Sequence, residues 1–366
     1  MSKEKVFEIQ KTKGLFGRLG EYNHELVLYC NDNATGLKAI IAVHNTTLGP
    51  AMGGLRMWNY KSEEDALFDV LRLSRGMTLK NALAGINVGG GKAVIIGDAR
   101  TQKNEYLLRR FGKFVNNLGG KYYTAEDVGM SAADMEFVGM ETPYVTGMPV
   151  ERGGSGDPSP VTAYGVYLGM KASLKYATGS DSLNGKKVLV QGVGHVGSYL
   201  VDHLVKENAK VFIYDIYPDT LAKVASRTGA EVITEEQIFT MPVDIFAPCA
   251  LGGVLNPDTI PLLNCDIVAG AANNQLLDEI RDAEALKARE ILYAPDFMVN
   301  AGGIINVSLE LDVYNKDIAM RMTERIYETS LKTFNMAEEN QITTHQAALQ
   351  MANDRIQAVG QNMLFR

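Results

Sequence analysis

The sequence predicts an α/β protein of two domains, in which the second domain is built on a doubly wound parallel sheet. Short apolar runs alternate with stretches of helical spacing along the 366 residues, a length that allows two domains with separate cores. A glycine- and proline-rich segment at residues 152–160 is typical of a linker or hinge. Beyond this segment, an apolar run leads into a glycine-rich turn that opens a helix.

In the first part of the chain, the apolar runs at residues 25–29 and 37–43 predict two strands. A helix should begin at Ser62, whose hydroxyl can cap it while the acidic residues 63–65 favour its positive end. We expect Gly76 to break this helix and Lys80 to lie on a second, short helix that ends at Gly85.

Three glycines at 89–91 directly precede Lys92, and Lys80 lies twelve residues before Lys92. Glycines have no Cβ and tolerate positive φ, so we expect a loop that another group approaches closely, followed by an ammonium held in place. The stretch is not a nucleotide P-loop, because Ile86 and Ala93 occupy the positions that require Gly and Ser or Thr.

A strand–turn–helix–strand unit spans residues 187–215. Its glycines fit the spacing G-x-G-x-x-G, and the helix predicted at 198–207 would direct its N-terminal amides at a phosphate. The strand at 211–214 ends at Asp215, which can accept hydrogen bonds from the ribose hydroxyls of NAD and would repel the extra phosphate of NADP. The unit predicts a Rossmann-type NAD site made by Gly192, Gly194, His195, Val196, Gly197 and Asp215, with the His195 side chain in water.

The chain therefore divides into three predicted parts. Residues 1–150 should form the substrate domain, residues 151–330 the NAD domain, and a cleft should separate the two. Helices predicted at 325–339 and 344–362 make residues 331–366 a C-terminal segment that packs back on the first domain.

Composition narrows the function. The net charge is −7 with no basic cluster, which argues against nucleic acid or an anionic membrane as a partner. We find no stretch of signal-peptide or membrane-span character. The three cysteines are odd in number and lack CxxC spacing, which favours a cytoplasmic location, and the five scattered histidines lead us to predict no metal.

The ionisable residues of the first domain suggest acid–base chemistry. Two ammonium groups, at Lys80 and Lys92, suit a substrate that carries a carboxylate. One can pair with that carboxylate, while the other, desolvated beside a like charge, would have a lowered pKa and act as a base near neutrality. Asp127 would supply a second proton acceptor of different strength.

Five motifs in order identify a family. They lie at residues 49–57, 77–82, 89–92, 124–129 and 300–306, and with the cofactor turn they resemble the glutamate/leucine/phenylalanine/valine dehydrogenases over nearly the whole chain. The resemblance implies that Lys80 binds the substrate carboxylate, Lys92 is the catalytic lysine and Asp127 takes a proton from the substrate ammonium. It also implies a homo-oligomer, with an octamer as the expected size.

The same resemblance assigns further residues. The backbone at Gly53 and Gly54 is expected to lie near the substrate. Asn274 is expected to orient the substrate, with Asn273 as the alternative, and Asn273 is also expected to contact the cofactor. Further cofactor contacts are expected at Thr162, Cys249 and Ala250. The side-chain pocket is expected to be apolar throughout, formed by Met52, Ala125, Ile304 and Val307.

The implied reaction is reversible oxidative deamination of L-leucine and other branched-chain L-amino acids. Glutamate is disfavoured because Met52 stands where the glutamate enzymes have a lysine, which would leave a second carboxylate unpaired. Phenylalanine or valine dehydrogenation in the same family is the nearest alternative, since one methylene is worth only about 1–3 kcal/mol. Other classes are a non-catalytic NAD-binding or sensor protein and a 2-hydroxy-acid dehydrogenase, for which no histidine motif is suitable.

Overall fold

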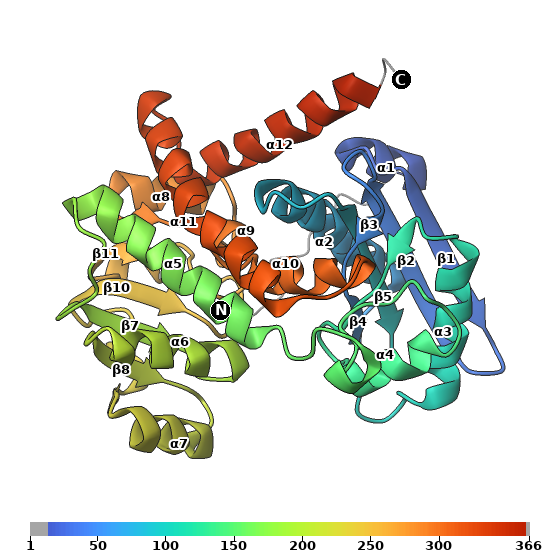
Figure 1. Ribbon diagram of the computed structural model, residues 1–366, viewed down its shortest axis with the longest axis horizontal. Coiled ribbons are helices and arrows are strands. Elements are labelled where there is room, and N and C mark those ends of the chain that lie inside the picture. The colour runs from blue at the N-terminus through green and yellow to red at the C-terminus, as the bar shows by residue number, and fades with distance from the viewer. Residues whose placement is uncertain (1–13, 364–366) are drawn as a thin grey trace. The chain divides into compact units, whose positions relative to one another are not determined.

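The computed structural model describes residues 14–363, and the chain forms two compact units (Figure 1). The first comprises the chain up to Asp157 together with Val307–Tyr314 and the residues from Ile356 onward. The second comprises Pro158–Asn306 and Asn315–Arg355. Residues 331–355 thus group with the second unit, whereas the sequence suggested packing on the first, because α11 (Lys316–Glu339) lies along α5 (Ser159–Thr178).

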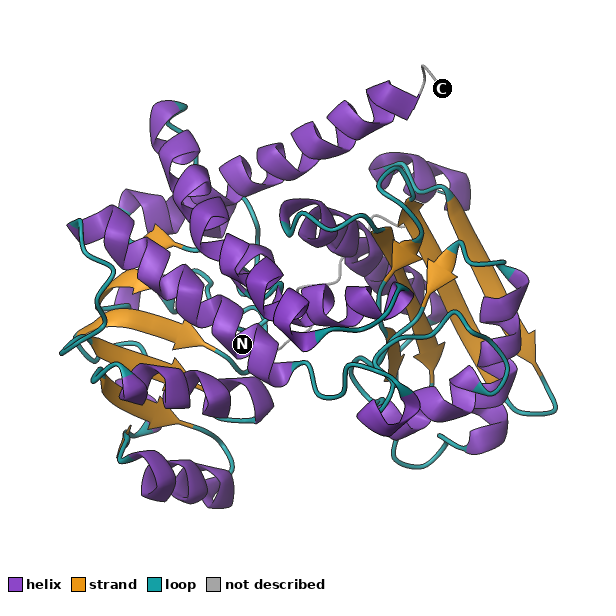
Figure 2. Cartoon of the chain, in the orientation of Figure 1, coloured by secondary structure: helices purple, strands orange, loops and turns teal. Residues whose placement is uncertain are grey.

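The first unit is built on a mixed six-stranded sheet with the order β1-β2-β5-β3-β6, in which β4 also pairs with β5. Strands are drawn in orange in Figure 2. The pairs β1–β2 and β2–β5 are antiparallel, and the others are parallel. The strands predicted at 25–29 and 37–43 are confirmed as β1 and β2. The strands are β1 (Leu26–Asp32), β2 (Leu37–Asn45), β3 (Ala51–Met52), β4 (Leu55–Trp58), β5 (Gly89–Ile96) and β6 (Tyr122–Tyr123).

Helices cover both faces of this sheet because its strands are apolar on both sides. In β2, Ile40 packs in the cluster beneath α2, the longest helix of this unit, whereas Ile41 packs in the larger cluster of the opposite face, as the period of two in a strand requires. The opposite face is covered by α3 and α4. The helices are α1 (Leu15–Tyr22), α2 (Glu63–Leu83), α3 (Glu105–Asn117) and α4 (Ala132–Gly139).

The predicted break at Gly76 is wrong, because α2 runs without interruption from Glu63 to Leu83 and carries Lys80 in its last turn. Its start matches the prediction, since the side chain of Ser62 accepts a hydrogen bond from the backbone N–H of Asp65. A glycine within a helix costs only about 1 kcal/mol, and burial of the α2 face against β5 outweighs this cost.

The second unit has a six-stranded sheet with the order β12-β11-β10-β7-β8-β9, and every pair is parallel. The strand order reverses between β7 and β10, which confirms the predicted doubly wound sheet and the α/β class. The strands are β7 (Lys187–Gln191), β8 (Lys210–Tyr214), β9 (Glu231–Val232), β10 (Val243–Pro248), β11 (Cys265–Val268) and β12 (Leu292–Tyr293).

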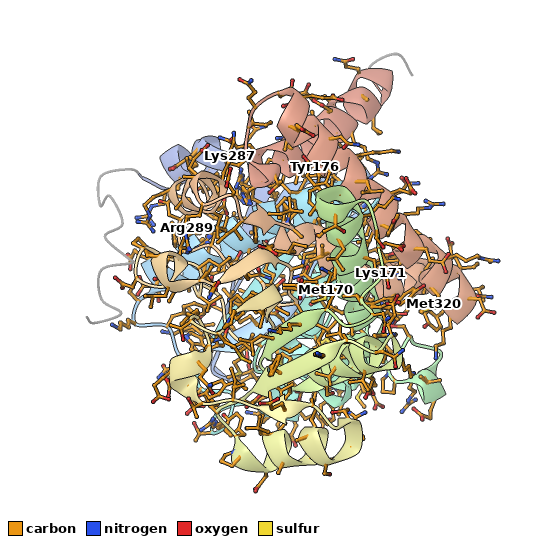
Figure 3. All side chains as sticks on the ribbon, turned by 90° about the vertical axis from the view of Figure 1, so that its left-hand side faces the viewer. Met170, Lys171, Tyr176, Lys287, Arg289 and Met320 are labelled. Atoms are coloured by element: carbon orange, nitrogen blue, oxygen red, sulfur yellow. The ribbon has the colours of Figure 1, made fainter. Side chains whose placement is uncertain are left out.

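Long helices of the second unit pack against one another. Lys171 and Tyr176, labelled in Figure 3, hold α5 to its neighbours: Lys171 pairs with Glu207 at 2.5 Å, and the Tyr176 hydroxyl donates to Glu338 at 2.9 Å. The helices of this unit are α5, α6 (His195–Lys206), α7 (Pro218–Thr228), α8 (Arg281–Ala288), α9 (Asp296–Val299) and α11, together with the first parts of α10 (Gly302–Ser308) and α12 (Thr344–Met363), which continue into the first unit. Short 3₁₀ turns lie at Val150–Arg152, Glu235–Gln237, Ile260–Leu262 and Leu309–Leu311.

The described residues contain neither a membrane-spanning helix nor a clustered metal site. Between residues 14 and 363, no helix has both the length and the apolar character that crossing a bilayer requires. In the same range, no cluster of three or more His, Cys, Asp or Glu side chains is arranged as a metal site. Cys30, Cys249 and Cys265 are all free thiols.

Candidate active site

The triple glycine is part of a buried strand. Residues 89–91 begin β5, and none of the three has a positive φ, so the predicted loop is wrong while the predicted close approach is right. A Cβ on Gly90 would overlap the backbone N and the hydroxyl of Thr78 in α2, and one on Gly91 would lie 2.7 Å from the ring of Tyr122. The glycines therefore let α2 and the 122–127 segment pack directly on the strand that carries Lys92.

Strand alternation brings the polar side chains of this unit to one face of the sheet. In β5, Val94 packs beneath α2, and Lys92 has the same parity. In β4, the neighbours of Arg56 pack on the opposite face, so Arg56 also points to the α2 side. The same reasoning places Met52 there, since Ala51 packs on the other face.

Lys92, Asp127 and Arg56 form a buried charged cluster. The Nζ of Lys92 lies 2.8 Å from Oδ1 of Asp127, and the Nε of Arg56 donates to Oδ2 of the same carboxylate at 2.9 Å. Only 5% of the Lys92 side chain is exposed. Arg56 also donates from a terminal nitrogen to Asp69 at 3.0 Å, and the hydroxyl of Tyr60 donates to that same oxygen at 2.6 Å.

Burial and the neighbouring charges shift the pKa values of the cluster in ways suited to proton transfer. Burial lowers the pKa of Lys92; the attraction of Asp127 opposes this shift without cancelling it, and the charge of Arg56 adds to the lowering. For Asp127, burial alone would raise the pKa, but the two cations Lys92 and Arg56 together hold it well below its usual range. From the sequence, Lys80 was expected to be the like charge that lowers the pKa of Lys92. In the structure, that like charge is Arg56.

The Gly53–Gly54 pair fits between the strand of Lys92 and the segment of Asp127. A Cβ on Gly53 would overlap the carbonyl of Gly91, and one on Gly54 would lie 2.8 Å from the Cβ of Asp127. The carbonyl oxygen of Gly53 accepts a hydrogen bond from the Tyr122 hydroxyl at 2.6 Å. Only glycine permits this approach, so the two glycines help to place Asp127 beside Lys92.

Lys80 lies half-buried in the last turn of α2. It shares a helix face with Met77, three residues earlier, whose side chain lies against Gly53. The buried Asn81 donates to the carbonyl of Gly89 at 2.6 Å, which fixes this turn against the start of β5. The structure therefore places Lys80 on the part of α2 that adjoins the glycine pair.

The apolar residues predicted for the side-chain pocket differ in exposure. Met52 is 0% exposed, Ala125 and Val307 are each 7% exposed, and Ile304 is partly buried. The carbonyl of Ala125 accepts a hydrogen bond from the backbone N–H of Leu55 at 2.7 Å. Met52, Ala125 and Val307 belong to the first unit and Ile304 to the second, because the division runs through α10.

In the second unit, the three glycines of the turn after β7 differ in what surrounds them. A Cβ on Gly192 (φ +96°) would lie 2.8 Å from Ala250, and one on Gly197 would overlap the carbonyl of Gly192. At Gly194, nothing lies within 4 Å of the added Cβ. The outer glycines thus serve packing, whereas the exposed middle one leaves free the space before the N-terminus of α6, where a pyrophosphate can bind.

The other residues predicted to bind the cofactor surround this turn. Asp215 follows β8, and its Oδ2 accepts a hydrogen bond from the N–H of Val193 at 2.8 Å. Val196 is partly buried in α6, and the exposed His195 is the first residue of this helix. Cys249 and Ala250 follow β10; burial raises the pKa of the Cys249 thiol to about 12.

The remaining predicted residues lie near the N-termini of α5 and α10. The hydroxyl of Thr162 donates to the carbonyl of Pro158 at 3.0 Å, and a Cβ on Gly303 would lie 2.7 Å from that hydroxyl oxygen. Asn273 and Asn274 are both exposed. The Oδ1 of Asn273 accepts a hydrogen bond from Asn300 at 2.8 Å, and Asn274 has a positive φ of 52°.

Three polar residues of the first-unit cluster were missed by the sequence analysis: Arg56, Asp69 and Tyr60. Arg56 follows the glycine pair at 53–54 within a motif that was identified, so its place in that motif was the available signal. Nothing local marks Asp69 or Tyr60, because their roles depend on contacts that form only when α2 packs on the sheet.

Comparisons with known proteins agree with this geometry. Residues 24–144 match the family model "Glu/Leu/Phe/Val dehydrogenase, dimerisation domain", and residues 153–216 and 215–362 match "Glutamate/Leucine/Phenylalanine/Valine dehydrogenase". The chain is 53% identical to a leucine dehydrogenase of Geobacillus stearothermophilus over 94% of both chains, and 47% identical to a phenylalanine dehydrogenase of Caldalkalibacillus thermarum over 91% of both. The crystal structure of L-tryptophan dehydrogenase from Nostoc punctiforme superposes with a TM-score of 0.83 at 44% identity, covering 94% of this chain and 99% of that one.

Proposed function

This chain belongs to the glutamate/leucine/phenylalanine/valine dehydrogenase family, and we propose that it catalyses the reversible NAD-dependent oxidative deamination of L-leucine and other branched-chain L-amino acids. The resemblance inferred from the sequence motifs is thereby confirmed. The observation that carries the proposal is the buried ion pair of Lys92 and Asp127, in a unit that also presents Lys80. The reaction converts the L-amino acid, water and NAD⁺ into a 2-oxo acid, ammonium, NADH and a proton.

Lys80 is proposed to bind the substrate carboxylate. It is a half-buried ammonium next to the glycine pair, where its point charge can meet an anion without the fixed geometry of a guanidinium. The predicted pocket residues Met52, Ala125 and Val307 are buried and apolar, which suits an aliphatic side chain. A substrate with a second carboxylate would find no partner among these three.

NAD is proposed as the cofactor, held at the turn of Gly192, Gly194 and Gly197 and at Asp215. The open space at Gly194 and the free N–H groups of a twelve-residue helix suit a pyrophosphate. Asp215 retains lone pairs for the ribose hydroxyls while it bonds Val193, and its charge disfavours a 2′-phosphate. When bound, NAD would accept the hydride from the substrate Cα.

Lys92 is proposed as the group that gains and loses the proton. Its lowered pKa favours the neutral amine compared with an ordinary lysine, which suits it to deprotonate the substrate ammonium and then activate the water that attacks the imine. The family resemblance instead implies that Asp127 accepts the proton of the substrate ammonium. The two cations beside Asp127 make it a weak base, so we now propose that it stays ionised and accepts hydrogen bonds from the substrate ammonium and Lys92.

Three further features are proposed on the basis of family membership: the oligomeric state, the location and the metabolic role. The match of residues 24–144 to a dimerisation domain supports a homo-oligomer, for which we propose an octamer. A cytoplasmic location and a role in branched-chain amino-acid catabolism accord with a deaminating enzyme that uses NAD. Phenylalanine or valine as the best substrate remains the alternative within the family, and a non-catalytic NAD-binding protein is the alternative outside it.

The test is NADH formation by the purified chain at alkaline pH with L-leucine, L-isoleucine, L-valine, L-phenylalanine and L-glutamate, with NADP measured in parallel. Fastest turnover with leucine and its branched relatives supports the proposal. A preference for phenylalanine would keep the chemistry and overturn the proposed pocket. Absence of turnover with all five, while NAD still binds, would favour the non-catalytic alternative.

A further inference from the structure

Arg56 joins two carboxylates that come from distant parts of the chain. Its Nε donates to Oδ2 of Asp127 at 2.9 Å, and its NH1 donates to Oδ2 of Asp69 at 3.0 Å. Asp127 follows β6 and Asp69 lies in the second turn of α2, so the guanidinium spans from the catalytic segment to the helix that carries Lys80. The Arg56 side chain is 23% exposed, so most of it is removed from water.

The contacts of Asp127 separate its two oxygens. Oδ1 faces Lys92 at 2.8 Å, and Oδ2 is held by Arg56. If Oδ2 were not held, the carboxylate could rotate about its own bond and exchange the two oxygens. Arg56 is itself held from the other side by Asp69, whose acceptor oxygen also receives the Tyr60 hydroxyl at 2.6 Å. The orientation of Asp127 is thus set by a chain of contacts that begins on α2.

On the premise of the proposed function, we propose that Arg56 is a positioning residue for the reaction: it orients Asp127 so that one oxygen faces Lys92. Asp69 and Tyr60 hold Arg56 in place. A lysine cannot take over this role, because an ammonium is a point charge on a flexible stem, whereas the planar guanidinium offers donors in fixed directions to two carboxylates at once.

The charges around Lys92 determine what a change at Arg56 would do to its proton. The charges that act on Lys92 come from Arg56 on β4, from Asp69 on α2 and from Asp127 in the segment after β6. His44, on β2, is turned to α2, where it contacts the Thr78 hydroxyl at 2.8 Å. The Glu126 side chain lies at Gly147. Arg56 lowers the pKa of Lys92 and Asp69 raises it, so their removal should have opposite effects.

The experiment compares kcat, KM and the pH profile of kcat/KM for L-leucine in the wild type and in Arg56→Lys, Arg56→Gln and Asp69→Asn. We expect Arg56→Gln to lower kcat roughly 10- to 100-fold and to move the acidic limb of the profile to higher pH. Arg56→Lys should lower kcat without moving that limb, because the charge stays and the geometry is lost. Asp69→Asn should move the limb to lower pH. The matched control is Arg109→Gln, which breaks a surface pair with Glu141 in the same unit and should change none of these quantities.

The outcomes distinguish this proposal from the proposed function. If the wild type turns over leucine while the Arg56 variants keep its kcat and its pH profile, the positioning role is refuted and the function stands. Shifts of the acidic limb in the same direction for Arg56→Gln and Asp69→Asn would also refute it. A general loosening of the fold would not move the limb in opposite directions for the two variants, whereas the loss of opposite charges should. A wild type without activity on any amino acid refutes both. Melting temperatures of all variants show whether each is folded.

Discussion

Replacing Lys92 with methionine should abolish turnover without destabilising the chain. At 2.8 Å, the attraction between Lys92 and Asp127 amounts to about 6 kcal/mol at an effective dielectric constant of ~20. The lowered pKa of Lys92 nevertheless shows that the cost of burying its charge exceeds this attraction. Lys92→Met therefore removes a group whose charged form the fold disfavours, and Asp127 keeps Arg56 as a counter-ion.

The expected magnitudes follow from this balance. Methionine is unbranched and close to lysine in volume, so the packing change should cost less than about 1.5 kcal/mol. A shift of 1 kcal/mol corresponds to about 2–4 °C in Tm for a unit of this size, so the Tm should stay within a few degrees of the wild type or rise. Loss of the proton-transfer group should lower kcat by roughly 10²–10⁴.

The pH dependence has a definite sign. The pKa of Lys92 is lower in the folded chain than in the unfolded chain, so between these two pKa values the unfolded chain binds more protons. Wild-type stability therefore rises with pH through this window. Below the pKa of Lys92 in the folded chain, the free-energy cost of burying its charged form is fully present. Any Tm advantage of Lys92→Met should shrink as the pH approaches about 10, the ordinary lysine value.

The assay combines thermal unfolding at several pH values with NADH formation from leucine. Asp127→Asn is the matched comparison: it leaves two buried cations without their shared anion and should lose roughly 3–5 kcal/mol of stability. More than a tenth of wild-type turnover in Lys92→Met would refute the assigned role. A fall in its Tm as large as that of Asp127→Asn would refute the charge balance.

Three other predictions address packing and the cofactor. Gly90→Ala should prevent stable folding, because its Cβ would overlap the backbone of Thr78. Gly76→Ala in α2, where nothing lies within 4 Å of the added Cβ, should instead gain about 1 kcal/mol of stability. Thermal unfolding and soluble yield compare the two variants, and equal stability would contradict the packing argument. Glu310→Gln should lose about 1–3 kcal/mol of folding stability, because the Glu310 carboxylate accepts hydrogen bonds from the backbone N–H groups of residues 147, 148 and 155 at 2.8–3.4 Å. Denaturant unfolding measures this loss, and the control Glu338→Gln should show little change. Asp215→Ala should raise the KM for NAD and improve the use of NADP, because it removes a carboxylate; an unchanged ratio of kcat/KM for the two cofactors would contradict this role.

The sequence could predict the second unit well because its signal is local. One strand, a turn of three spaced glycines, a helix and a second strand lie within 30 residues, and each step constrains the next. The strands β7 and β8 begin within one residue of their predicted starts. The helix α6 begins three residues before its predicted start. Residues 331–355 were predicted less well, because composition cannot say which unit an amphipathic helix will cover.

The first unit was harder because its close contacts form between distant residues. Three consecutive glycines suggest a loop, since glycine is unfavourable within a strand. The strand nevertheless forms, because Thr78 of α2 and the ring of Tyr122 occupy the space where side chains at Gly90 and Gly91 would lie, and burial of these surfaces outweighs the cost. The same distance effect hid Arg56: its partner Asp127 lies 71 residues away in the chain, and no local pattern links the two.

The missed arginine changes how the charges of the site are balanced. With Lys92 protonated, the cluster of Lys92, Arg56, Asp127 and Asp69 carries no net charge. When Lys92 loses its proton, one negative charge remains in a cluster that is partly removed from water, and this favours a cationic partner. The ammonium of an amino acid is such a partner, and its proton restores neutrality when it passes to Lys92. A 2-hydroxy acid offers no such cation, so the four-residue balance itself favours an amino acid as the substrate of this fold.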